Sequence, residues 1–259
     1  MHKKVSSDSK IEFFSIDCKT RPLTKNLTYV VSNNLPYPIN VARNVARLNA
    51  KTHYVFASDV ELYPSENIIP RFLRLVENMK KKNSNFATKR QVFVLPVFEV
   101  KSGIQPPTRK EDLRTLMKRK VAVSFHQYVC DVCHRIPHLD RWLATKGSPI
   151  ALKIFMTTVQ TIKFGWEPFF IGTNKDPLFD ERLTWNGKNN KMQVSHELCY
   201  LRYDLHILDD AFLVHAPGIK MFDRNNKLRQ PFMAKNRRIF RKILKQLREK
   251  YKTVECGVS

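Results

Sequence analysis

Short apolar, β-prone runs recur along the chain and are separated by proline and polar residues. They predict strands at residues 11–17, 28–32 and 53–58. A longer apolar run over residues 91–100 predicts a buried strand that Pro96 weakens or bulges. Further strand-like segments are expected at residues 150–155, 161–164 and the end of 195–208.

Apolar residues at helical spacing fill other stretches of the chain. Val41, Val45 and Leu48 form one such stripe, with Asn40 as the expected N-cap of a helix over residues 41–48. The other expected helices lie at residues 66–82, 110–120, the start of 195–208 and 235–251. In the second of these, Ile69, Phe72, Leu73 and Val76 form the apolar face, and in the last the apolar face is expected to pack on the core rather than on lipid.

Strand and helix therefore alternate, which predicts an α/β fold with a mixed, mostly parallel sheet flanked by helices. The chain has 259 residues, of which 42% are hydrophobic, enough to bury a core. Seven Gly, 14 Pro and no repeat leave no internal boundary, so one domain over residues 1–259 is expected. No apolar stretch is about 18 residues long and the amino terminus is not signal-like, so no segment is expected to span a membrane.

Charge is the second strong feature, because 46 Lys and Arg against 23 Asp and Glu give a formal net charge of +23. Such a surface attracts polyanions. Nucleic acid, an anionic membrane face, a sugar nucleotide and an acidic glycan all qualify as partners. The basic runs at residues 80–82, 118–120 and 235–250 are equally compatible with solvated helix faces.

The five cysteines are an odd number, so at least one thiol is free or paired between chains. Cys130, Cys133 and His134 match the spacing of heme c attachment, and with His138 they could contribute to a zinc site. The preferred interpretation is a local disulfide or buried thiols, since a zinc site needs a second ligand pair. Asn26 begins a glycosylation sequon, which matters only in a lumenal chain.

Two carboxylates, Asp59 and Glu61, follow the apolar run at residues 53–58. The carboxyl ends of strands are where open α/β sheets bind ligands, and carboxylate oxygens suit Mg²⁺ or Mn²⁺ carrying a diphosphate. A solvated acidic turn after a strand is the alternative interpretation.

Two later segments end in titratable groups. Asp180 and Glu181 lie between Phe179 and Arg182, where one acid held in a pocket could be a general base or the pair could simply begin a helix. The apolar run at residues 211–214 ends at His215, with Lys220 close enough in sequence to meet phosphate. A neutral imidazole there could complete a metal site, or it could be an ordinary hydrogen-bonded histidine.

Five ordered segments resemble glycosyltransferase family 49, which holds the LARGE-type xylosyl/glucuronyltransferase domain and β-1,4-glucuronyltransferase. They are Tyr37 to Ala46, Ser58 to Ser65, Trp166 to Phe169, Phe179 to Arg182 and Phe212 to His215. The resemblance covers roughly residues 28–250, and the five segments in order are more specific than any one of them.

The resemblance implies a GT-A fold and an inverting, Mn²⁺- or Mg²⁺-dependent transfer from a UDP-sugar by a Golgi type II membrane protein. It matches Asp59 and Glu61 to the DxD motif and His215 to the later metal ligand. It also matches Arg43 and Asn44 to the helix beside the nucleotide-sugar. On the acceptor and catalytic side it matches Trp166, Glu167, Asp180 and Glu181, with Asp180 or Glu181 preferred as the base.

Three departures from the family pattern stand out. Glu61 replaces the second Asp of the metal motif, and the segment from His134 to Trp142, matched to an acceptor-side loop, has its proline displaced by one position. Only 58 residues precede Asp59. The nucleotide-binding part, including the strand that would hold uridine, is therefore expected to be incomplete.

The sequence thus predicts an enzyme that moves a sugar, glucuronate or xylose, from a UDP-sugar to a glycan or glycoprotein acceptor in protein O-glycosylation in the Golgi lumen. A truncated or inactive relative that binds glycan or protein is the alternative. A basic nucleic-acid-binding protein is less favoured, because no helix-turn-helix, zinc finger or RNA-binding signature is recognisable.

Overall fold

A computed structural model describes most of the chain, namely residues 32–33, 35–148, 150–160, 165–216, 218–221, 229–252 and 256. By their contacts, residues 36–259 form one compact unit and residues 1–35 another. All labelled helices and strands belong to the longer unit. The strands expected at 11–17 and 161–164, together with Cys18 and Asn26, lie outside the described residues, as does the strand expected at 28–32 apart from Ser32.

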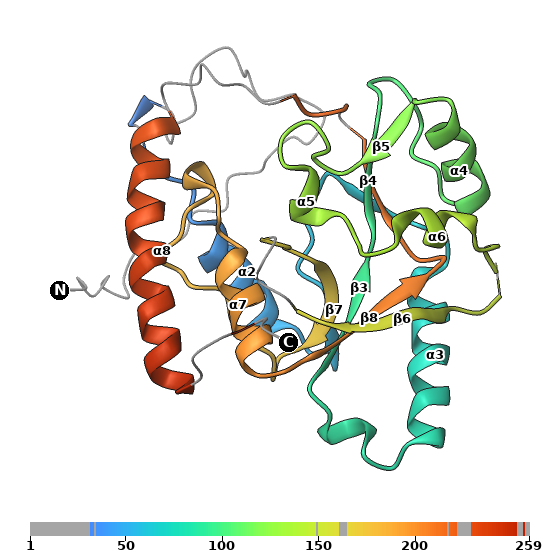
Figure 1. The fold of residues 1–259 in the computed structure, drawn as a ribbon, viewed down its shortest axis with the longest axis horizontal. Coiled ribbons are helices and arrows are strands. Elements are labelled where there is room, and N and C mark those ends of the chain that lie inside the picture. Colours follow the sequence, from blue (N-terminus) through green and yellow to red (C-terminus); the bar gives the residue numbers. More distant parts are fainter. Residues whose placement is uncertain are drawn as a thin grey trace, which may run out of the picture. The chain divides into compact units, whose positions relative to one another are not determined.

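The larger sheet has five strands in the order β1-β7-β3-β8-β6 (Figure 1). Its strands are β1 (Tyr54–Val55), β3 (Gln91–Leu95), β6 (Lys153–Val159), β7 (Phe169–Thr173) and β8 (Asp204–Asp209). The central pair, β3 and β8, is parallel, with Gln91 opposite Asp204. The other three pairings in this sheet are antiparallel.

The smaller sheet has four strands in the order β2-β9-β4-β5. Its strands are β2 (Leu62–Pro64), β4 (Val97–Val100), β5 (Ala122–Ser124) and β9 (Leu213–His215). The single strand expected over residues 91–100 is thus two strands in different sheets. Pro96 separates them: proline has no N–H for a ladder, while its carbonyl accepts a hydrogen bond from Leu213 N at 2.9 Å.

The α/β class and the mixed sheets flanked by helices are confirmed. The balance of the pairings differs from the expected mostly parallel arrangement, since five of the seven described strand pairs are antiparallel and two are parallel. Connection length does not explain this: β4 and β5 pair antiparallel although the segment between them, which contains α4, is long enough for a parallel crossover.

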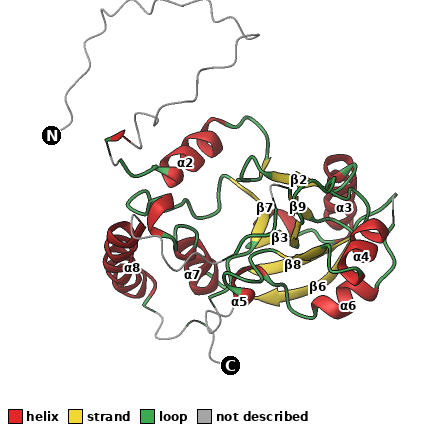
Figure 2. Ribbon diagram, turned by 90° about the horizontal axis from the view of Figure 1, so that it is seen from above, coloured by secondary structure: helices red, strands yellow, loops and turns green. Residues whose placement is uncertain are grey.

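The helices around the sheets include those expected from periodicity. They are α2 (Ile39–Asn49), α3 (Ile68–Lys82), α4 (Lys110–Lys118), α5 (Asp131–His134), α6 (Leu139–Ala144), α7 (Met192–Tyr200) and α8 (Gln230–Tyr251). Short 3₁₀ turns lie at Phe86–Thr88 and Trp185–Gly187. Helices α7 and α8 lie side by side, away from α3, α4 and α6 (Figure 2).

Helix α2 buries its polar face instead of the expected apolar one. Val45 and Leu48 are 54% and 61% exposed, whereas Asn40, Asn44 and Arg47 are buried. Asn40 is also not the N-cap, because the helix begins at Ile39 and the Asn40 side chain lies within its first turn. Amphipathic periodicity located the helix correctly, but it could not indicate that this helix packs through hydrogen bonds rather than apolar contacts.

Two buried ion pairs fix helices to the end of β8. Lys110 of α4 is fully buried and donates to Asp209 at 2.5 Å, and Arg71 of α3 pairs with the neighbouring Asp210. Burial lowers the pKa of Lys110, and the hydrogen bond and charge of Asp209 oppose that shift. Because a buried charge without its partner is costly, each pair holds its helix at one position against the sheet.

The Lys110 pair gives the first prediction. Lys110→Ala leaves the Asp209 carboxylate without its cation and should lower the free energy of unfolding by about 3–5 kcal/mol, measured by urea denaturation. Lys81→Ala breaks an exposed ion pair with Glu77 on α3 and should change stability little. Equal effects of the two substitutions would contradict this account of the Lys110 pair.

Candidate active site

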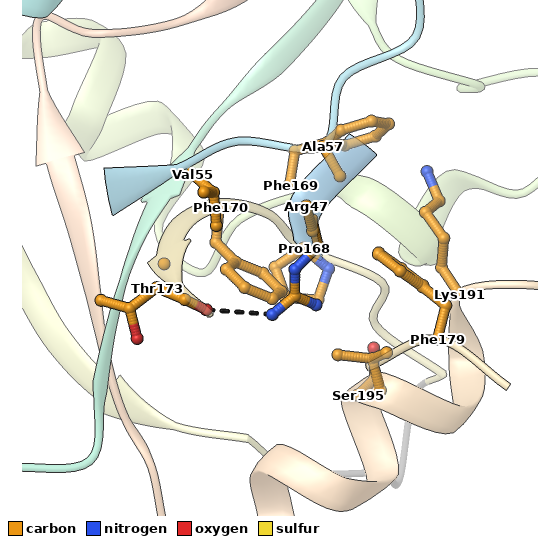
Figure 3. Close-up of a pocket in the computed structure, with 12 residues that line it drawn as sticks. Arg47, Val55, Ala57, Pro168, Phe169, Phe170, Thr173, Phe179, Lys191 and Ser195 are labelled. Carbon is orange, nitrogen blue, oxygen red and sulfur yellow. Dashed lines mark hydrogen bonds between the residues drawn. The ribbon is translucent and has the colours of Figure 1, made fainter. Parts of the chain in front are cut away.

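Helix α2 holds the segment that connects β7 to α7 by binding its backbone. The guanidinium of Arg47 donates to three backbone carbonyl groups of that segment, Thr173 O (2.9 Å), Asp176 O (3.0 Å) and Pro177 O (2.8 Å). Figure 3 shows the bond from Arg47 to Thr173. Arg47 therefore replaces the water that these carbonyl groups would otherwise bind.

Two asparagines extend this contact along α2. The amide of Asn44 donates to Phe179 O at 2.8 Å and to the Glu181 carboxylate at 3.0 Å, and it accepts from Phe179 N at 3.0 Å. The amide of Asn40 donates to Asp180 O at 2.8 Å. The segment with the two candidate catalytic acids is thus bound residue by residue to one face of the helix.

Arg43 joins the same helix to the acidic motif. Its guanidinium donates to Asp59 Oδ1 at 3.1 Å and to Asn190 Oδ1 at 2.7 Å, and it lies over the Phe179 ring at 5.2 Å from the ring centre. One residue therefore contacts three segments that are far apart in sequence. Arg43 and Asn44, matched by the resemblance to the helix beside the nucleotide-sugar, contact the acidic motif and the 173–190 segment respectively.

Glu61 and His215 meet across the smaller sheet, where β2 and β9 pair with Leu62 opposite His215. His215 Nε2 lies 3.0 Å from Glu61 Oε2, while Nδ1 donates to Gly218 O at 3.1 Å. Burial lowers the pKa of His215, with Lys220 adding to that shift, which favours the neutral ring. Both ring nitrogens of His215 therefore face acceptor oxygens, and a neutral ring has only one N–H to donate. When Nδ1–H is donated to Gly218 O, Nε2 and the Glu61 oxygen are both left with lone pairs, and a cation between them would bind both.

The three expected metal ligands are divided between two contacts. Glu61 pairs with His215, whereas Asp59 is turned to Arg43. Among the described residues, no group of three or more His, Cys, Asp and Glu side chains is arranged to hold a metal ion. Lys220, expected to meet phosphate, lies 3.6 Å from Glu61 Oε2 and so belongs to the same cluster.

Lys191 is a candidate that the sequence did not indicate. Its Nζ lies 3.5 Å from the centre of the Phe169 ring, in a pocket that Phe179 also lines (Figure 3). Burial lowers its pKa to about 8, and the charges of Glu167 and Asp59 act in the opposite direction. Lys191 follows two asparagines in a polar stretch without a motif, so only the fold could bring it to the site.

Glu167 is the half-buried carboxylate beside this lysine. Burial raises its pKa, and the charges of Lys191 and Arg43 partly offset that shift. Its backbone is fixed on both sides, since Glu167 N donates to Cys133 O at 2.6 Å and His134 Nδ1 donates to Glu167 O at 2.8 Å. A fixed carboxylate with a raised pKa has the properties of a general base.

The two acids of the 179–182 segment, Asp180 and Glu181, have different hydrogen-bond partners. Both carboxylate oxygens of Asp180 accept from the Arg182 side chain, at 2.9 and 2.6 Å, and one also accepts from Arg182 N. Glu181 is exposed and accepts from Asn44. In this arrangement Asp180 is neutralised by a bidentate ion pair, while Glu181 keeps one oxygen free of protein donors among the described residues.

The electrostatic balance around these groups is positive. Burial, with the charges of Lys220 and Lys191 adding to it, lowers the pKa of His126 to about 3. Burial also lowers the pKa of His134 well below its usual value, and again Lys191 contributes. Neutral histidines beside the ammonium groups of Lys191 and Lys220 indicate a site suited to an anion.

Trp142 and Trp166 lie in the hydrophobic core. Trp142 is fully buried, donates from Nε1 to Leu208 O at 2.9 Å and stacks on Phe98 at 5.7 Å between ring centres. Trp166 is 7% exposed and directly precedes Glu167. Both tryptophans therefore belong to the same buried hydrophobic cluster, and Trp166 is next to the site because it precedes Glu167.

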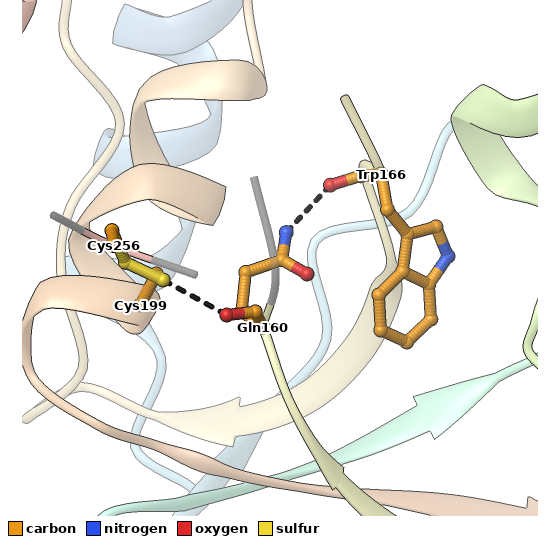
Figure 4. The surroundings of a disulfide bond; sticks show 4 residues. All are labelled: Gln160, Trp166, Cys199 and Cys256. Atoms are coloured by element: carbon orange, nitrogen blue, oxygen red, sulfur yellow. Dashed lines mark hydrogen bonds between the residues drawn. A yellow bond between two sulfur atoms is a disulfide. The ribbon is translucent and has the colours of Figure 1, made fainter. Parts of the chain in front are cut away.

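A disulfide joins Cys199 and Cys256, and Gln160 lies between it and Trp166 (Figure 4). Cys199 Sγ is 2.8 Å from Gln160 O, and the Gln160 amide donates to Trp166 O at 2.7 Å. The bond links α7 to a residue beyond α8, and through Gln160 it is connected to Trp166, the residue before Glu167.

Cys130 and Cys133 form a second, local disulfide. Their sulfurs are therefore not thiolates, which removes them as heme attachment points or zinc ligands in this structure. This bears out the preferred interpretation of the pair. His134 instead binds the backbone of Glu167.

Comparison with known proteins identifies one family. A family model described as "Glycosyl-transferase for dystroglycan" matches residues 1–252. The chain is 30% identical to β-1,4-glucuronyltransferase 1 of Danio rerio over 88% of its length and 27% identical to that of Homo sapiens over 91%. It is 27% identical to xylosyl- and glucuronyltransferase LARGE2s of Danio rerio over 77%.

The matches cover only part of each relative. The chain spans 51% and 54% of the two β-1,4-glucuronyltransferases and 25% of the LARGE2s protein. It therefore corresponds to about half the length of the former, and its two mixed sheets with flanking helices are consistent with a GT-A-like fold.

The contact between α2 and the 173–190 segment gives the second prediction. Asn44→Ala leaves the backbone N–H and C=O of Phe179 without their partner. Amide exchange in the peptides around Phe179, measured by mass spectrometry, should accelerate by roughly tenfold or more. Val45→Ala, on the exposed face of the same helix, should leave that exchange unchanged. Unaltered exchange in Asn44→Ala would show that α2 does not hold the segment.

Proposed function

The chain belongs to the family of glycosyl-transferases for dystroglycan, and we propose that it moves a sugar from a UDP-sugar to a hydroxyl of a glycan acceptor. Glucuronate and xylose are the favoured sugars, since the relatives' names specify glucuronyl and xylosyl transfer. The observation that carries the proposal is the contact between Glu61 and His215, two motif residues 154 positions apart whose donor atoms lie 3.0 Å from each other.

The residues present fit a divalent cation. A carboxylate oxygen and a neutral imidazole nitrogen are suitable ligands for Mn²⁺ or Mg²⁺ with water and phosphate, and the hydrogen bond to Gly218 O orients the ring for that role. Glu61 and His215 would hold the ion, with Asp59, which precedes Glu61 closely in sequence, as a third ligand once released from Arg43. The bound cation would neutralise negative charge on the leaving diphosphate.

Three cationic side chains are available for the phosphates themselves. Lys220 lies beside Glu61, Arg43 beside Asp59, and Lys191 lies in the adjoining pocket with no ion pair among the described residues. A half-buried ammonium without an ion pair is costly, and an anionic ligand would remove that cost. We therefore assign Lys191 to the diphosphate of the donor.

We assign the general base to Glu167. In an inverting transfer the acceptor oxygen bonds to the anomeric carbon, the sugar–phosphate bond breaks, and UDP leaves with the electron pair while a base takes the hydroxyl proton. Burial raises the pKa of Glu167, which strengthens it as a base, whereas Asp180 is occupied by Arg182. Glu181 remains the second candidate, because it is exposed and contacts Asn44.

The proposed setting is protein O-glycosylation in the Golgi lumen, as the family resemblance implies. Two disulfides are compatible with an oxidising compartment, and there Asn26 would be a glycosylation site. None of the described helices has the length and apolar composition needed to cross a membrane.

Transfer is the direct test. With Mn²⁺ and UDP-glucuronate or UDP-xylose, the protein should release UDP and extend a glycan acceptor, and EDTA should abolish both. Glu61→Gln should weaken Mn²⁺-dependent UDP binding by roughly tenfold or more in calorimetry, while the exposed Glu77→Gln should bind as the wild type does. Absence of both transfer and metal-dependent UDP binding in the folded protein would refute the proposal.

The assignment of Lys191 predicts a pH dependence. The pKa of about 8 means that the ammonium is charged at lower pH and neutral at higher pH, so affinity for UDP should fall as pH rises through and beyond 8. With Mg²⁺ present, Lys191→Met should bind roughly tenfold more weakly at pH 7 and lose that pH dependence, while Lys191→Arg should stay charged and keep its affinity. An unchanged pH profile in Lys191→Met would rule out this role.

A further inference from the structure

Helix α8 concentrates positive charge on one face. It carries eight Lys and Arg side chains against a single Glu within Gln230–Tyr251, a large part of the net charge of +23. Ile243 and Leu247 are buried against the rest of the unit, together with Asn236. The basic side chains are therefore directed to solvent by the same periodicity that buries the apolar ones.

Most of these cations have no counter-charge. Lys250 pairs with Glu197 at 2.9 Å, and Lys245 lies 3.9 Å from Glu249. Within the part of the chain that the structure describes, the remaining six make no ion pair: Lys235, Arg237, Arg238, Arg241, Lys242 and Arg248. A solvated surface helix commonly alternates its charges, whereas this one repeats a single sign.

Four of the side chains form a row. Arg237, Arg241, Lys245 and Arg248 recur every three or four residues, one on each successive turn, so they follow the helix axis over about 16 Å. A row of cations along a helix can pair with a linear polymer that carries negative charges along its length. We call the exposed surface around this row the α8 basic face.

We propose that the α8 basic face binds an anionic glycan chain whose carboxylates belong to uronate residues. The choice of glycan rests on the proposed function, because transfer of glucuronate makes such a chain. Guanidinium and ammonium groups pair with carboxylates directly, and Arg does so in two-point contacts.

Two other polyanions fit this face less well. A helix that binds a membrane surface inserts its apolar side chains into it. Here Ile243 and Leu247 lie opposite the basic row and are buried in the protein, so they are not available for insertion. Single-stranded nucleic acid is bound largely by stacking of its bases on aromatic side chains. The aromatic residues of this helix, Phe232, Phe240 and Tyr251, lie on its half-buried side instead.

Helix α8 contacts the segment of the candidate active site through side chains outside the basic row. Asn236 of α8 donates to Thr184 O at 2.9 Å and to Lys188 O at 2.7 Å, and Gln246 accepts from Arg182 at 2.9 Å. Arg182 also binds the Asp180 carboxylate. The helix that carries the basic face is therefore bound, on its other side, to the segment that α2 fixes.

The test is a binding titration with a labelled hyaluronan oligosaccharide of about ten sugars, which carries alternate glucuronate residues, followed by fluorescence polarisation. It is done in EDTA without donor, so the result does not depend on whether the protein transfers sugar. The wild type should bind, with affinity that falls as salt rises from about 50 to about 300 mM.

Matched variants locate the binding. Arg241→Gln/Lys245→Gln/Arg248→Gln should weaken it by about tenfold or more, while Lys118→Gln/Arg119→Gln/Lys120→Gln, which removes the same charge at the end of α4, should stay within about twofold. Absent binding, equal losses in both variants, or tighter α8-dependent binding of a DNA oligonucleotide or phosphatidylserine vesicles would overturn the proposal. Circular dichroism checks that both variants are folded.

Discussion

The buried polar face of α2 is the constraint on which the candidate site depends. Arg47, Asn44 and Asn40 take up backbone groups of the 173–190 segment that no strand or helix satisfies, and Arg43 on the adjacent turn binds Asp59. A loop fixed through its backbone can keep its side chains in place without a packed core of its own. One short helix thereby sets the distance between the acidic motif and the acids at 180 and 181.

Burial of charge gives the site its chemical character. Glu167 has a raised pKa and Lys191 a lowered one, both chiefly because they are removed from water. Each shift marks a group whose charged form is less stable than in solvent, and each would be relieved by a ligand of suitable charge or by proton transfer. The positive balance near Lys191 and Lys220, together with the basic surface of α8, suits a protein whose proposed substrates are a nucleotide diphosphate and an acidic glycan.

Much of the fold could be predicted from the sequence, because helical and strand periodicities are local. Pro96 indicated a weakened strand, although not that the chain changes sheets there. Asp59, Glu61 and His215 were recognisable as polar groups at strand ends, but their partition into two contacts follows from long-range pairing of β2 with β9. Lys191 had no motif, and the inverted face of α2 depends on backbone acceptors more than 120 residues away.

The central claim is that Glu61 and His215 together anchor a cation and a nucleotide-sugar, although they belong to motifs at opposite ends of the unit. A crystal structure of the protein soaked with Mn²⁺ and UDP tests this most directly, because manganese gives an anomalous signal. The account predicts an anomalous peak bonded to a Glu61 carboxylate oxygen and His215 Nε2, with the UDP phosphates beside it. A peak elsewhere, or UDP bound away from these residues, would contradict it.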